Sequence, residues 1–506
     1  MRGIPSLITD IRKNVFTEVA RMAYAGGDYT NAEDLPYKIV PGDQPLHRES
    51  IFLERAIAGE RVRLAMGLGI RPIQTRSLMT EGMDHAAIAQ QYYEPPLINV
   101  IPYACHVCPT NQYKVTIGCQ NCLAQSCQQV CPRDAIVFKN GRSFIETEKC
   151  IKCGKCAAAC PYNAIIHLER PCQAACGMDA IGMDEQGRAI INQEKCVSCG
   201  QCLVSCPFGA IVDKGQIYQV VRSIVEGEKV IAIMAPAFFN QFGKEATPAK
   251  LRKAMRVLGF SDTVEVAIGA DLCTIEEAHD FLDKVPEKQP FMATSCCPAW
   301  SVMAKKLFPE FSDYISMALT PMVITARLIK KDHPEAKIVF VGPCAAKKLE
   351  ASRRSVRSDV DFVLTFEELQ GMFAAKDVDF AALQPDECDK DFSDGTGAGR
   401  GFAVGGGVAA AVVDYIKKID PEREVNIEYG DGLRECRKML LMAKAGKRNG
   451  YLLEGMGCIG GCVAGAGTIA PVASAAAGIR AYKDAAEKKH ADESSFADRL
   501  EEATKE

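Results

Sequence analysis

The chain of 506 residues is poor in aromatic side chains and has no excess of basic charge. Aromatic residues make up 7% of it, with a single Trp, and 60 Lys and Arg stand against 64 Asp and Glu, for a formal net charge of −4. Nucleic-acid-binding proteins are typically basic, so this balance argues against nucleic acid as a partner. The seven His show no paired spacing, and the sequence indicates no His-based zinc centre.

Long apolar runs of the kind that target or anchor a protein are also scarce. No apolar run follows Arg2 within Met1–Asp10, so we expect no signal peptide and a cytoplasmic location. Gly455–Ile479 lacks charge and is long enough to span a bilayer, but seven of its residues are Gly. A buried, glycine-rich loop and helix close to a bulky group fits this segment better than a membrane span.

The length predicts about three domains at about 150 residues each, and composition suggests four segments along the chain. Residues 1–95 contain no Cys and are expected to be mostly helical, a cap or docking surface, with helices over Ile8–Ala20 and Arg48–Leu68 and a loop at Pro36–Pro45. Residues 486–506 form a charged, Ala-rich tail, expected to be a solvated helix or disordered.

The two central segments carry the cysteines. Residues 96–215 contain short strand-like runs between cysteine motifs, which is typical of a ferredoxin-like α+β fold, and residues 216–485 predict an α/β domain. Its expected strands are Lys229–Met234, Pro290–Ala293 and Lys337–Val341, and its expected helices include Ile275–Val285 and Ser301–Phe308.

Cysteine is the residue that the chain has in excess. Of its 24 Cys, sixteen lie between Cys105 and Cys206 and eight between Cys273 and Cys462. Disulfides do not persist in a reducing cytosol, and disulfide scaffolds are usually short secreted chains. Thiolates at this density therefore predict metal. Cys273, Cys388 and Cys436 have no Cys partner in register and are expected to be buried apolar residues.

The first sixteen cysteines follow the pattern C-x2-C-x2-C-x3-C-P of two-cluster ferredoxins, in which the fourth Cys ligates the other cluster. The pattern has two complete matches, Cys150, Cys153, Cys156 and Cys160, and Cys196, Cys199, Cys202 and Cys206. A third set matches with a longer middle gap: Cys119, Cys122, Cys127 and Cys131. The remaining four, Cys105, Cys108, Cys172 and Cys176, are two halves of a fourth motif, separated by an insertion that is itself a two-cluster unit. We therefore expect one ferredoxin-like unit nested within another, with four 4Fe-4S clusters in all.

Crossed ligation predicts how the sixteen thiolates divide among the four clusters. The inner groups are Cys119, Cys122, Cys127 and Cys160, and Cys150, Cys153, Cys156 and Cys131; the outer groups are Cys196, Cys199, Cys202 and Cys176, and Cys105, Cys108, Cys172 and Cys206. Structural zinc is the alternative, but zinc sites rarely show three-cysteine runs that end in Cys-Pro. Four clusters in one chain form a path for single electrons.

Three further cysteine motifs lie in the predicted α/β domain. They are Thr294-Ser295-Cys296-Cys297-Pro298-Ala299-Trp300, Gly342-Pro343-Cys344-Ala345-Ala346-Lys347-Lys348-Leu349-Glu350 and Glu454-Gly455-Met456-Gly457-Cys458-Ile459-Gly460-Gly461-Cys462. The first two directly follow expected strands, where open α/β sheets place their sites. Four cysteines from three loops could converge on one further cubane, with a fifth thiol beside it.

These three motifs resemble the signature motifs of the iron-only (FeFe) hydrogenase family over about residues 100–480. The resemblance implies an H-cluster, in which a 4Fe-4S cubane is joined through a cysteine sulfur to a two-iron unit that carries CO, cyanide and azadithiolate. It implies cubane ligation by Cys297, Cys344, Cys458 and Cys462, with Cys462 as the bridge. It further implies proton transfer by Cys296, a hydrogen bond from Lys347 to cyanide, and packing of Met456 and Ala235-Pro236-Ala237 around the two-iron unit.

Protons must also reach such a buried site. Glu277, Asp280 and Lys284 are spaced to share one face of a helix, which by itself is most often a solvated charged face. Their position before the first motif resembles the proton path of the family, in which Ser316 would also take part, so Glu277, Asp280 and Ser316 are candidate proton carriers.

The sequence departs from the best-studied family members at a few positions. Ala299 stands where Gly is usual, Gly342 where Met is usual, and Met317-Ala318-Leu319-Thr320 differs from the usual polar run. These variants resemble the group B branch of the family. They bear on rate, direction and oxygen sensitivity.

The sequence thus predicts a hydrogenase that interconverts H2 with protons and electrons, exchanges electrons with a ferredoxin or flavodoxin, and receives its two-iron unit from maturation enzymes. No segment resembles a flavin or NAD module. The alternative is a non-catalytic relative, an iron–sulfur assembly factor or a redox or H2 sensor, that keeps the cubane ligands alone.

Overall fold

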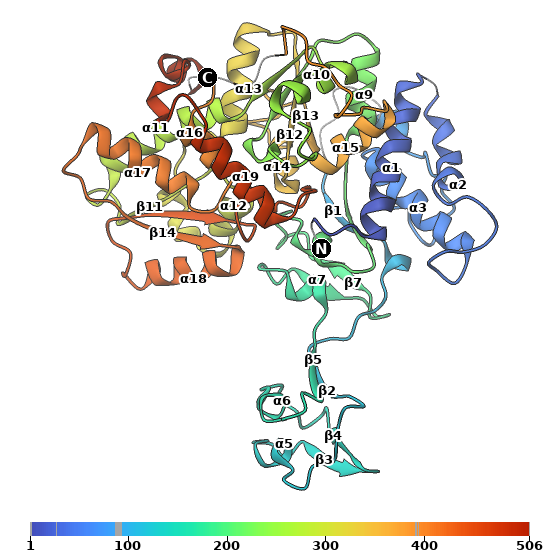
Figure 1. The fold of residues 1–506 in the computed structure, drawn as a ribbon. Helices are drawn as coiled ribbons and strands as arrows, with labels where there is room; N and C mark the ends of the chain where they lie inside the picture. The colour runs from blue at the N-terminus through green and yellow to red at the C-terminus, as the bar shows by residue number, and fades with distance from the viewer. Residues whose placement is uncertain (1–2, 27, 87–93, 390–391, 393, 505–506) are drawn as a thin grey trace.

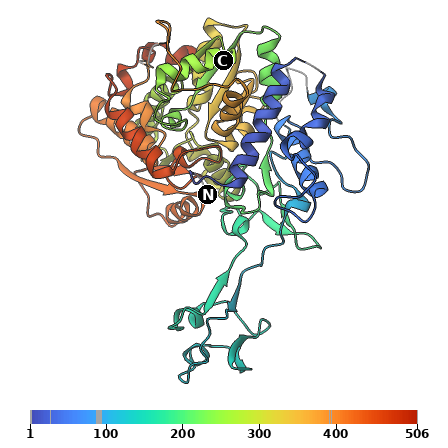
Figure 2. The same ribbon diagram turned by 45° about the vertical axis from the view of Figure 1, so that its right-hand side comes forward.

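The computed structural model describes residues 3–26, 28–86, 94–389, 392 and 394–504. A large body contains the two ends of the chain, and a small cysteine-rich unit projects from it on a pair of strands, as Figures 1 and 2 show from two directions. The expected fold class is confirmed: a helical N-terminal segment, a ferredoxin-like middle and an α/β C-terminal part.

The N-terminal segment packs against the α/β part through its first helix. Its helices are α1 (Leu7–Tyr24), α2 (Leu35–Ile39), α3 (Ile51–Ala65) and α4 (Met83–Ala86). Ser6 caps α1 in a capping box with Thr9, and α1 lies along α15. The expected loop at Pro36–Pro45 is wrong in its first residues, because Pro36 lies in the first turn of α2, where its missing N–H is no loss.

The cysteine-rich middle is built from four antiparallel strand pairs. Its strands are β1 (Ile98–Val100), β2 (Gln112–Val115), β3 (Ile136–Lys139), β4 (Arg142–Ile145), β5 (Ile165–Leu168), β6 (Ile181–Met183), β7 (Ala189–Ile191) and β8 (Ile211–Asp213), and its helices are α5 (Ser126–Gln129), α6 (Lys155–Ala158), α7 (Pro171–Ala174) and α8 (Gln201–Ser205). The pairs are β1 with β8, β2 with β5, β3 with β4 and β6 with β7. Since β2 pairs with β5, the chain between them leaves the body and returns to it, which forms the projecting unit in Figure 1.

The α/β part contains two parallel sheets. One has the order β10 (Asp262–Glu265), β9 (Val230–Met234), β12 (Lys337–Gly342) and β13 (Phe362–Thr365); the other has the order β11 (Phe291–Ala293), β15 (Tyr451–Met456) and β14 (Asn426–Asp431). Strands β9 and β12, at the centre of the first sheet, are buried and apolar except at Lys337, as expected for parallel strands covered on both faces.

Helices surround both sheets (Figure 1). They are α9 (Ile217–Val225), α10 (Pro248–Leu258), α11 (Ala267–Lys284), α12 (Pro298–Leu307), α13 (Pro321–Asp332), α14 (Ala345–Ala351), α15 (Phe366–Ala375), α16 (Gly397–Gly401), α17 (Gly407–Ile419), α18 (Leu433–Lys444), α19 (Val472–Asp484) and α20 (Leu500–Thr504). Helix α11 begins well before the expected Ile275. Its first turns are buried and contain a single charged residue, Asp271, so the sequence shows no polar helix face there. A Cβ at Gly269 would lie 2.3 Å from the Pro321 carbonyl oxygen, so α11 and α13 pack closely there.

The C-terminal residues are not a solvated tail, which corrects the expectation for residues 486–506. Ala491 and Ala503 are buried in a cluster with residues of α11 and α13. Arg499 donates two hydrogen bonds of 2.9 Å to Asp332 at the end of α13. Small and apolar residues on one side of this segment form its buried face. The many charged residues of the segment led to the expectation of a solvated tail.

The glycine-rich segment Gly455–Ile479 lies beside a bulky side chain, as expected. A Cβ at Gly455 would lie 2.1 Å from the ring of Trp300, which is fully buried. In the parts of the chain that the structure describes, every helix is too short or too polar to cross a bilayer.

A buried group of charges joins three parts of the chain. The fully buried Lys348 ammonium in α14 donates to Asp213 at 2.8 Å and to Glu368 at 3.0 Å, and Arg12 of α1 donates to Asp213 at 3.2 Å. Asp213 ends β8 and Glu368 lies in α15. Because Lys348 is close to Cys344 in the chain, this network ties the N-terminal helix and the ferredoxin-like region to a helix of the candidate site.

We expect Lys348→Met to lower the free energy of unfolding by about 3–5 kcal/mol, because it leaves buried carboxylates without their partner. Urea unfolding followed by circular dichroism measures this change. Lys438→Met is the matched control, since Lys438 pairs with Glu435 on the surface and should cost no more than about 1 kcal/mol. Equal effects of the two substitutions would contradict the proposed importance of the buried network.

Candidate functional site

The three C-terminal cysteine motifs meet where strands of both parallel sheets end. Cys297 follows β11 and is the N-cap of α12, Cys344 follows β12 and is the N-cap of α14, and Cys462 begins a 3-10 turn after β15. Strand β12 belongs to one sheet, whereas β11 and β15 belong to the other. The structure therefore brings together cysteines that come from the carboxyl ends of two sheets.

A cavity of about 80 Å³ lies between these motifs. Its lining contains Cys296, Cys297, Cys344, Cys462, Lys347, Met456 and the segment Ala235-Pro236-Ala237, all of them predicted site residues, together with Phe340, Phe402 and others. Cys458 lies next to this lining, since its thiol is close enough to Cys344 and Cys462 to contribute to the raised pKa of both thiols.

Tight packing at glycines holds the motifs against one another. The Gly457 N–H donates to Cys297 Sγ at 3.4 Å, and a Cβ at Gly457 would lie 2.9 Å from the Cβ of Ala299. A Cβ at Gly465 would lie 2.3 Å from the Pro343 carbonyl oxygen. The third motif thus packs directly on the first, and the segment that follows it packs on the second. Glycine permits both contacts.

The spacing of the cysteine sulfurs fits a cluster better than a single metal ion. A tetrahedral zinc with bonds of about 2.3 Å would hold its sulfurs about 3.8 Å apart. Among the described residues, however, no three cysteine sulfurs lie within 4.8 Å of one another. The wider separation suits a polynuclear iron–sulfur group, which spreads its thiolate ligands over several iron atoms.

Lys347 presents a buried cation to the cavity. Its Nζ lies 2.7 Å from Glu350 Oε2, but the pair is poorly aligned, and Nζ makes no hydrogen bond within the described residues. Burial lowers the pKa of Lys347, but the Glu350 carboxylate outweighs burial and the net pKa is raised, so the ammonium stays charged. A buried ammonium with donors to spare is suited to an anionic ligand such as cyanide.

The Cys296 thiol lies between this cavity and a buried carboxyl group. Glu277 of α11 is fully buried, and its Oε1 accepts the Ser295 N–H at 3.0 Å. Burial raises the pKa of Glu277 to about 8, against the opposing effects of the Ser295 N–H and the nearby Ser316 hydroxyl. Burial and then Glu277 raise the pKa of Cys296 well above its usual value. Both groups are therefore protonated at neutral pH.

Asp280, another predicted proton carrier, and Lys284 lie on the same helix nearer the surface, whereas the predicted carrier Ser316 is buried in the segment before α13. Asp280 and Lys284 are half-buried and form an ion pair of 2.8 Å. The charged side chains of α11 thus become less buried from Glu277 to Asp280 and Lys284. A proton path from the site to solvent requires such an arrangement.

The structure explains why position 342 is Gly, where Met is usual in the family. A Cβ there would lie 2.5 Å from the ring of Phe340, which lines the cavity, and 3.1 Å from the Cβ of Ala235. In this chain Phe340 fills space that a Met at position 342 would need. Met456 is buried in the cavity wall, as expected.

The structure also brings the first sixteen cysteines into four groups. Three small cavities are each lined by four of them: Cys119, Cys122, Cys127 and Cys160; Cys131, Cys150, Cys153 and Cys156; and Cys105, Cys108, Cys172 and Cys206. The thiols of Cys176, Cys196, Cys199 and Cys202 interact with one another. These are the groups that crossed ligation predicts, and their role as ligands remains a prediction.

Three residues at the site were not predicted from the sequence, and one cysteine differs from its predicted burial. Glu350 and Ser295 lie within the quoted motifs, but their contacts with Lys347 and Glu277 are visible only in the structure. Gln201 donates from Nε2 to Cys458 Sγ at 3.1 Å, and nothing in the sequence relates these positions. Cys273 and Cys436 are buried, as expected, but Cys388 is exposed, since it lies in a surface loop beside Arg256.

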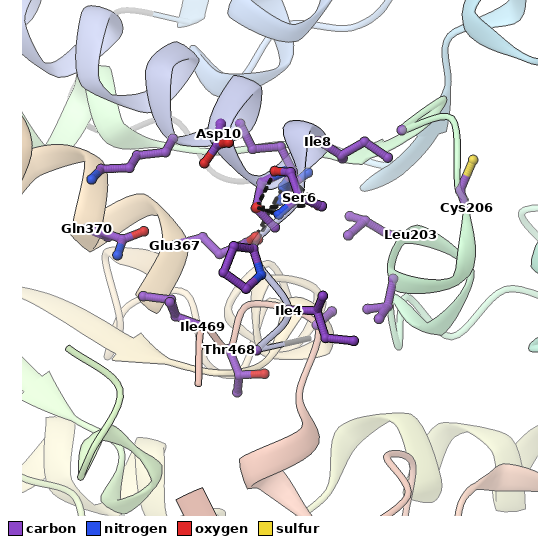
Figure 3. A pocket seen from close by; sticks show the side chains of 18 of the residues that line it. Ile4, Ser6, Ile8, Asp10, Leu203, Cys206, Glu367, Gln370, Thr468 and Ile469 are labelled. Carbon is purple, nitrogen blue, oxygen red and sulfur yellow. Dashed lines mark hydrogen bonds and ion pairs between the residues drawn. The ribbon is translucent and has the colours of Figure 1, made fainter. Parts of the chain in front are cut away.

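A second cavity, of about 270 Å³, lies at the start of α1 (Figure 3). Ile4, Ser6 and Ile8 line it from one segment, with Cys206 on one side and Gln370 on the other. Its lining mixes apolar side chains with both signs of charge and contains one thiol. It therefore lacks a set of converging ligands, in contrast to the cavity between the three motifs.

Comparison with known proteins agrees with this geometry. Residues 228–466 match the iron only hydrogenase large subunit, C-terminal domain, and residues 144–166 and 189–212 match the 4Fe-4S binding domain. Iron hydrogenase 1 of Clostridium pasteurianum is 31% identical over 395 residues, which cover 68% of this chain and 68% of that protein. The chain belongs to the iron-only hydrogenase family.

This family contains proteins of more than one described function. The cytosolic Fe-S cluster assembly factor narfl of Danio rerio is 26% identical over 319 residues, which cover 51% of this chain and 77% of that protein. A solved FeFe-hydrogenase structure, from work on oxygen inactivation, covers 57% of this chain and 94% of its own at 21% identity, with a TM-score of 0.48. Family membership supports iron–sulfur cofactors, whereas the activity must be argued from the site residues.

The contact between Phe340 and position 342 can be tested by a double-mutant cycle. We expect Gly342→Met to lower the free energy of unfolding by about 1–3 kcal/mol through overpacking. Combining it with Phe340→Ala should restore space, so the double mutant should be more stable than the two single effects predict by about 1–3 kcal/mol. Urea unfolding measures all three variants, and additive effects would show that the two positions do not compete for space.

Proposed function

We propose that this chain is a hydrogenase of the group B branch, which interconverts H2 with protons and electrons at an H-cluster. The observation that carries the proposal is the placement of Cys296 and Lys347 in one cavity with the cubane cysteines. Four thiolates are enough to hold a cubane. A fifth thiol and a buried ammonium with free donors have a use only if a second, anionic group lies beside it.

Different residues of the cavity would hold the two parts of the H-cluster. Cys297, Cys344, Cys458 and Cys462 would ligate the cubane, and Cys462 would bridge to the two-iron unit. Lys347 would donate to a cyanide ligand, while Met456 and Ala235-Pro236-Ala237 would enclose the unit and exclude water. When bound, the H-cluster supplies the metal and amine at which H2 is formed or split.

The chain itself would move protons between this cavity and solvent. Cys296 and Glu277 are both protonated at neutral pH, so each can give up a proton and then regain one. Ser316 lies beside Glu277, and Asp280 lies one turn further along α11 and nearer the surface. The proposed order is Cys296, Glu277, Ser316 and Asp280.

Electrons would pass through four 4Fe-4S clusters held by the sixteen upstream cysteines. The projecting unit carries the two inner groups, and one of their cysteines, Cys153, is exposed. A ferredoxin or flavodoxin that docks there could exchange electrons with an inner cluster. Maturation enzymes would have to supply the two-iron unit, because no residue of this chain makes CO or cyanide.

Cys296→Ala tests the proposal most directly. We expect the matured wild-type protein to evolve H2 from a reduced dye and to show infrared bands of CO and cyanide, and the variant to keep these bands but lose at least 99% of its activity, because its proton donor is gone. Cys388→Ala, which removes an exposed thiol outside the cavity lining, is the control. Full activity of Cys296→Ala would refute the proton role.

Glu277→Gln separates proton transfer from folding. The amide keeps an oxygen that can accept the Ser295 N–H but cannot release and regain a proton, so we expect at least a hundredfold loss of H2 evolution with unchanged infrared bands. Glu276→Gln, on the neighbouring and less buried residue, should retain most of the activity. Equal losses in the two variants would argue against a specific path through Glu277.

The second candidate function is iron–sulfur cluster assembly or redox sensing without a two-iron unit. The match to the narfl assembly factor favours it. Protein of this kind would show no CO or cyanide bands after maturation and would contain about 20 iron atoms when fully loaded, whereas the hydrogenase would contain about 22. The infrared experiment therefore decides between the two functions.

A further inference from the structure

The loop between Cys199 and Cys202 lies directly against the candidate H-cluster site. Gly200, in this loop, has a φ of +75°. A Cβ at Gly200 would lie 2.3 Å from the Cβ of Ala466 and 3.4 Å from the Cβ of Ala345, the residue after Cys344. The glycine therefore permits a close approach between a predicted cluster loop and the residues around the cubane cysteines.

Gln201 makes a direct contact across this interface. Its side-chain Nε2 donates to Cys458 Sγ at 3.1 Å, over a separation of 257 residues. The other hydrogen bonds to predicted cluster thiols join residues of one predicted cluster and its own surroundings, as from Ala180 N–H to Cys176, from Gly457 N–H to Cys297 and between the Ser143 hydroxyl and Cys119. Gln201 differs because it belongs to the loop of one cluster and donates to a ligand of another.

We propose that Gln201 is a positioning residue that links the cluster of Cys176, Cys196, Cys199 and Cys202 to the cubane and sets the reduction potential of the cubane. This inference rests on the iron–sulfur part of the proposed function and is independent of the two-iron unit. Hydrogen bonds to cysteine sulfurs stabilise the reduced, more negative state of an iron–sulfur cluster and so raise its potential. The amide is neutral, so its contribution should not vary with pH.

The same contact provides a short route for an electron. From Cys199 or Cys202 the route follows the backbone to Gln201, then its side chain and the hydrogen bond to Cys458. With both groups bound, one electron would pass along these residues from the upstream cluster, which would be oxidised, to the cubane, which would be reduced. No bond is broken, and the amide hydrogen stays on nitrogen.

Gln201→Met tests the inference, because it keeps the length of the side chain and removes the donor. The experiment uses the full chain loaded with its accessory clusters and cubane but without the two-iron unit, so it does not depend on hydrogenase activity. We expect a redox titration followed by electron paramagnetic resonance to show a lower cubane potential. We also expect electron transfer to the cubane after flash reduction to slow by at least tenfold.

Gln120→Met is the matched control. Gln120 lies between Cys119 and Cys122 of an inner group, is exposed, and donates only locally, to the Gly118 carbonyl at 3.3 Å. The Gln120→Met substitution should leave the cubane potential and the rate of electron transfer to the cubane unchanged. If Gln201→Met does not load its full iron content, Gln201→Leu, which also lacks a donor and adds no charge, replaces it.

The outcomes separate this inference from the proposed function. A cubane potential in Gln201→Met equal to that of the wild type overturns the role of Gln201, whatever the protein catalyses. A lower potential that is absent in Gln120→Met supports it, even if the matured wild type shows no CO or cyanide bands and the hydrogenase proposal fails.

Discussion

The constraint on which the site depends is the convergence of thiols from strands of two separate parallel sheets. Cys297 follows β11, Cys344 follows β12, and Cys458 and Cys462 follow β15, so the buried strands set where each motif begins. Parallel strands place their carboxyl ends at one edge of a sheet. Two such edges facing a common cavity provide ligands on several sides of a cluster, which a single short loop cannot do.

Small residues make this convergence possible. Gly455 accommodates the ring of Trp300, Gly457 packs on Ala299 in the first motif, and Gly465 packs on Pro343 in the second. Each contact would clash with a Cβ. A high glycine content often indicates a flexible segment, but here the glycines permit close packing. The three motifs therefore form one packed unit rather than three independent loops.

The proposed routes of protons and electrons enter this unit through different elements. Helix α11 carries Glu277 to the side of Cys296, while α8 carries Gln201 to Cys458. The N-terminal helix takes part indirectly, because Arg12 and Lys348 share the carboxylate of Asp213. Helix α1 thus helps to hold the ferredoxin-like region on the α/β part.

The sequence by itself determined which cysteines belong together and where the main strands lie. Ligand spacing within a loop and apolar runs within a strand are local properties, and the groups of cysteines and β9, β11 and β12 agree with them. Tertiary structure alone decided the contact of Gln201 with Cys458, the competition between Phe340 and position 342, the early start of α11 and the packing of Ala503. These features join residues that are far apart in the chain or depend on which face a neighbouring element covers, and no local pattern records either.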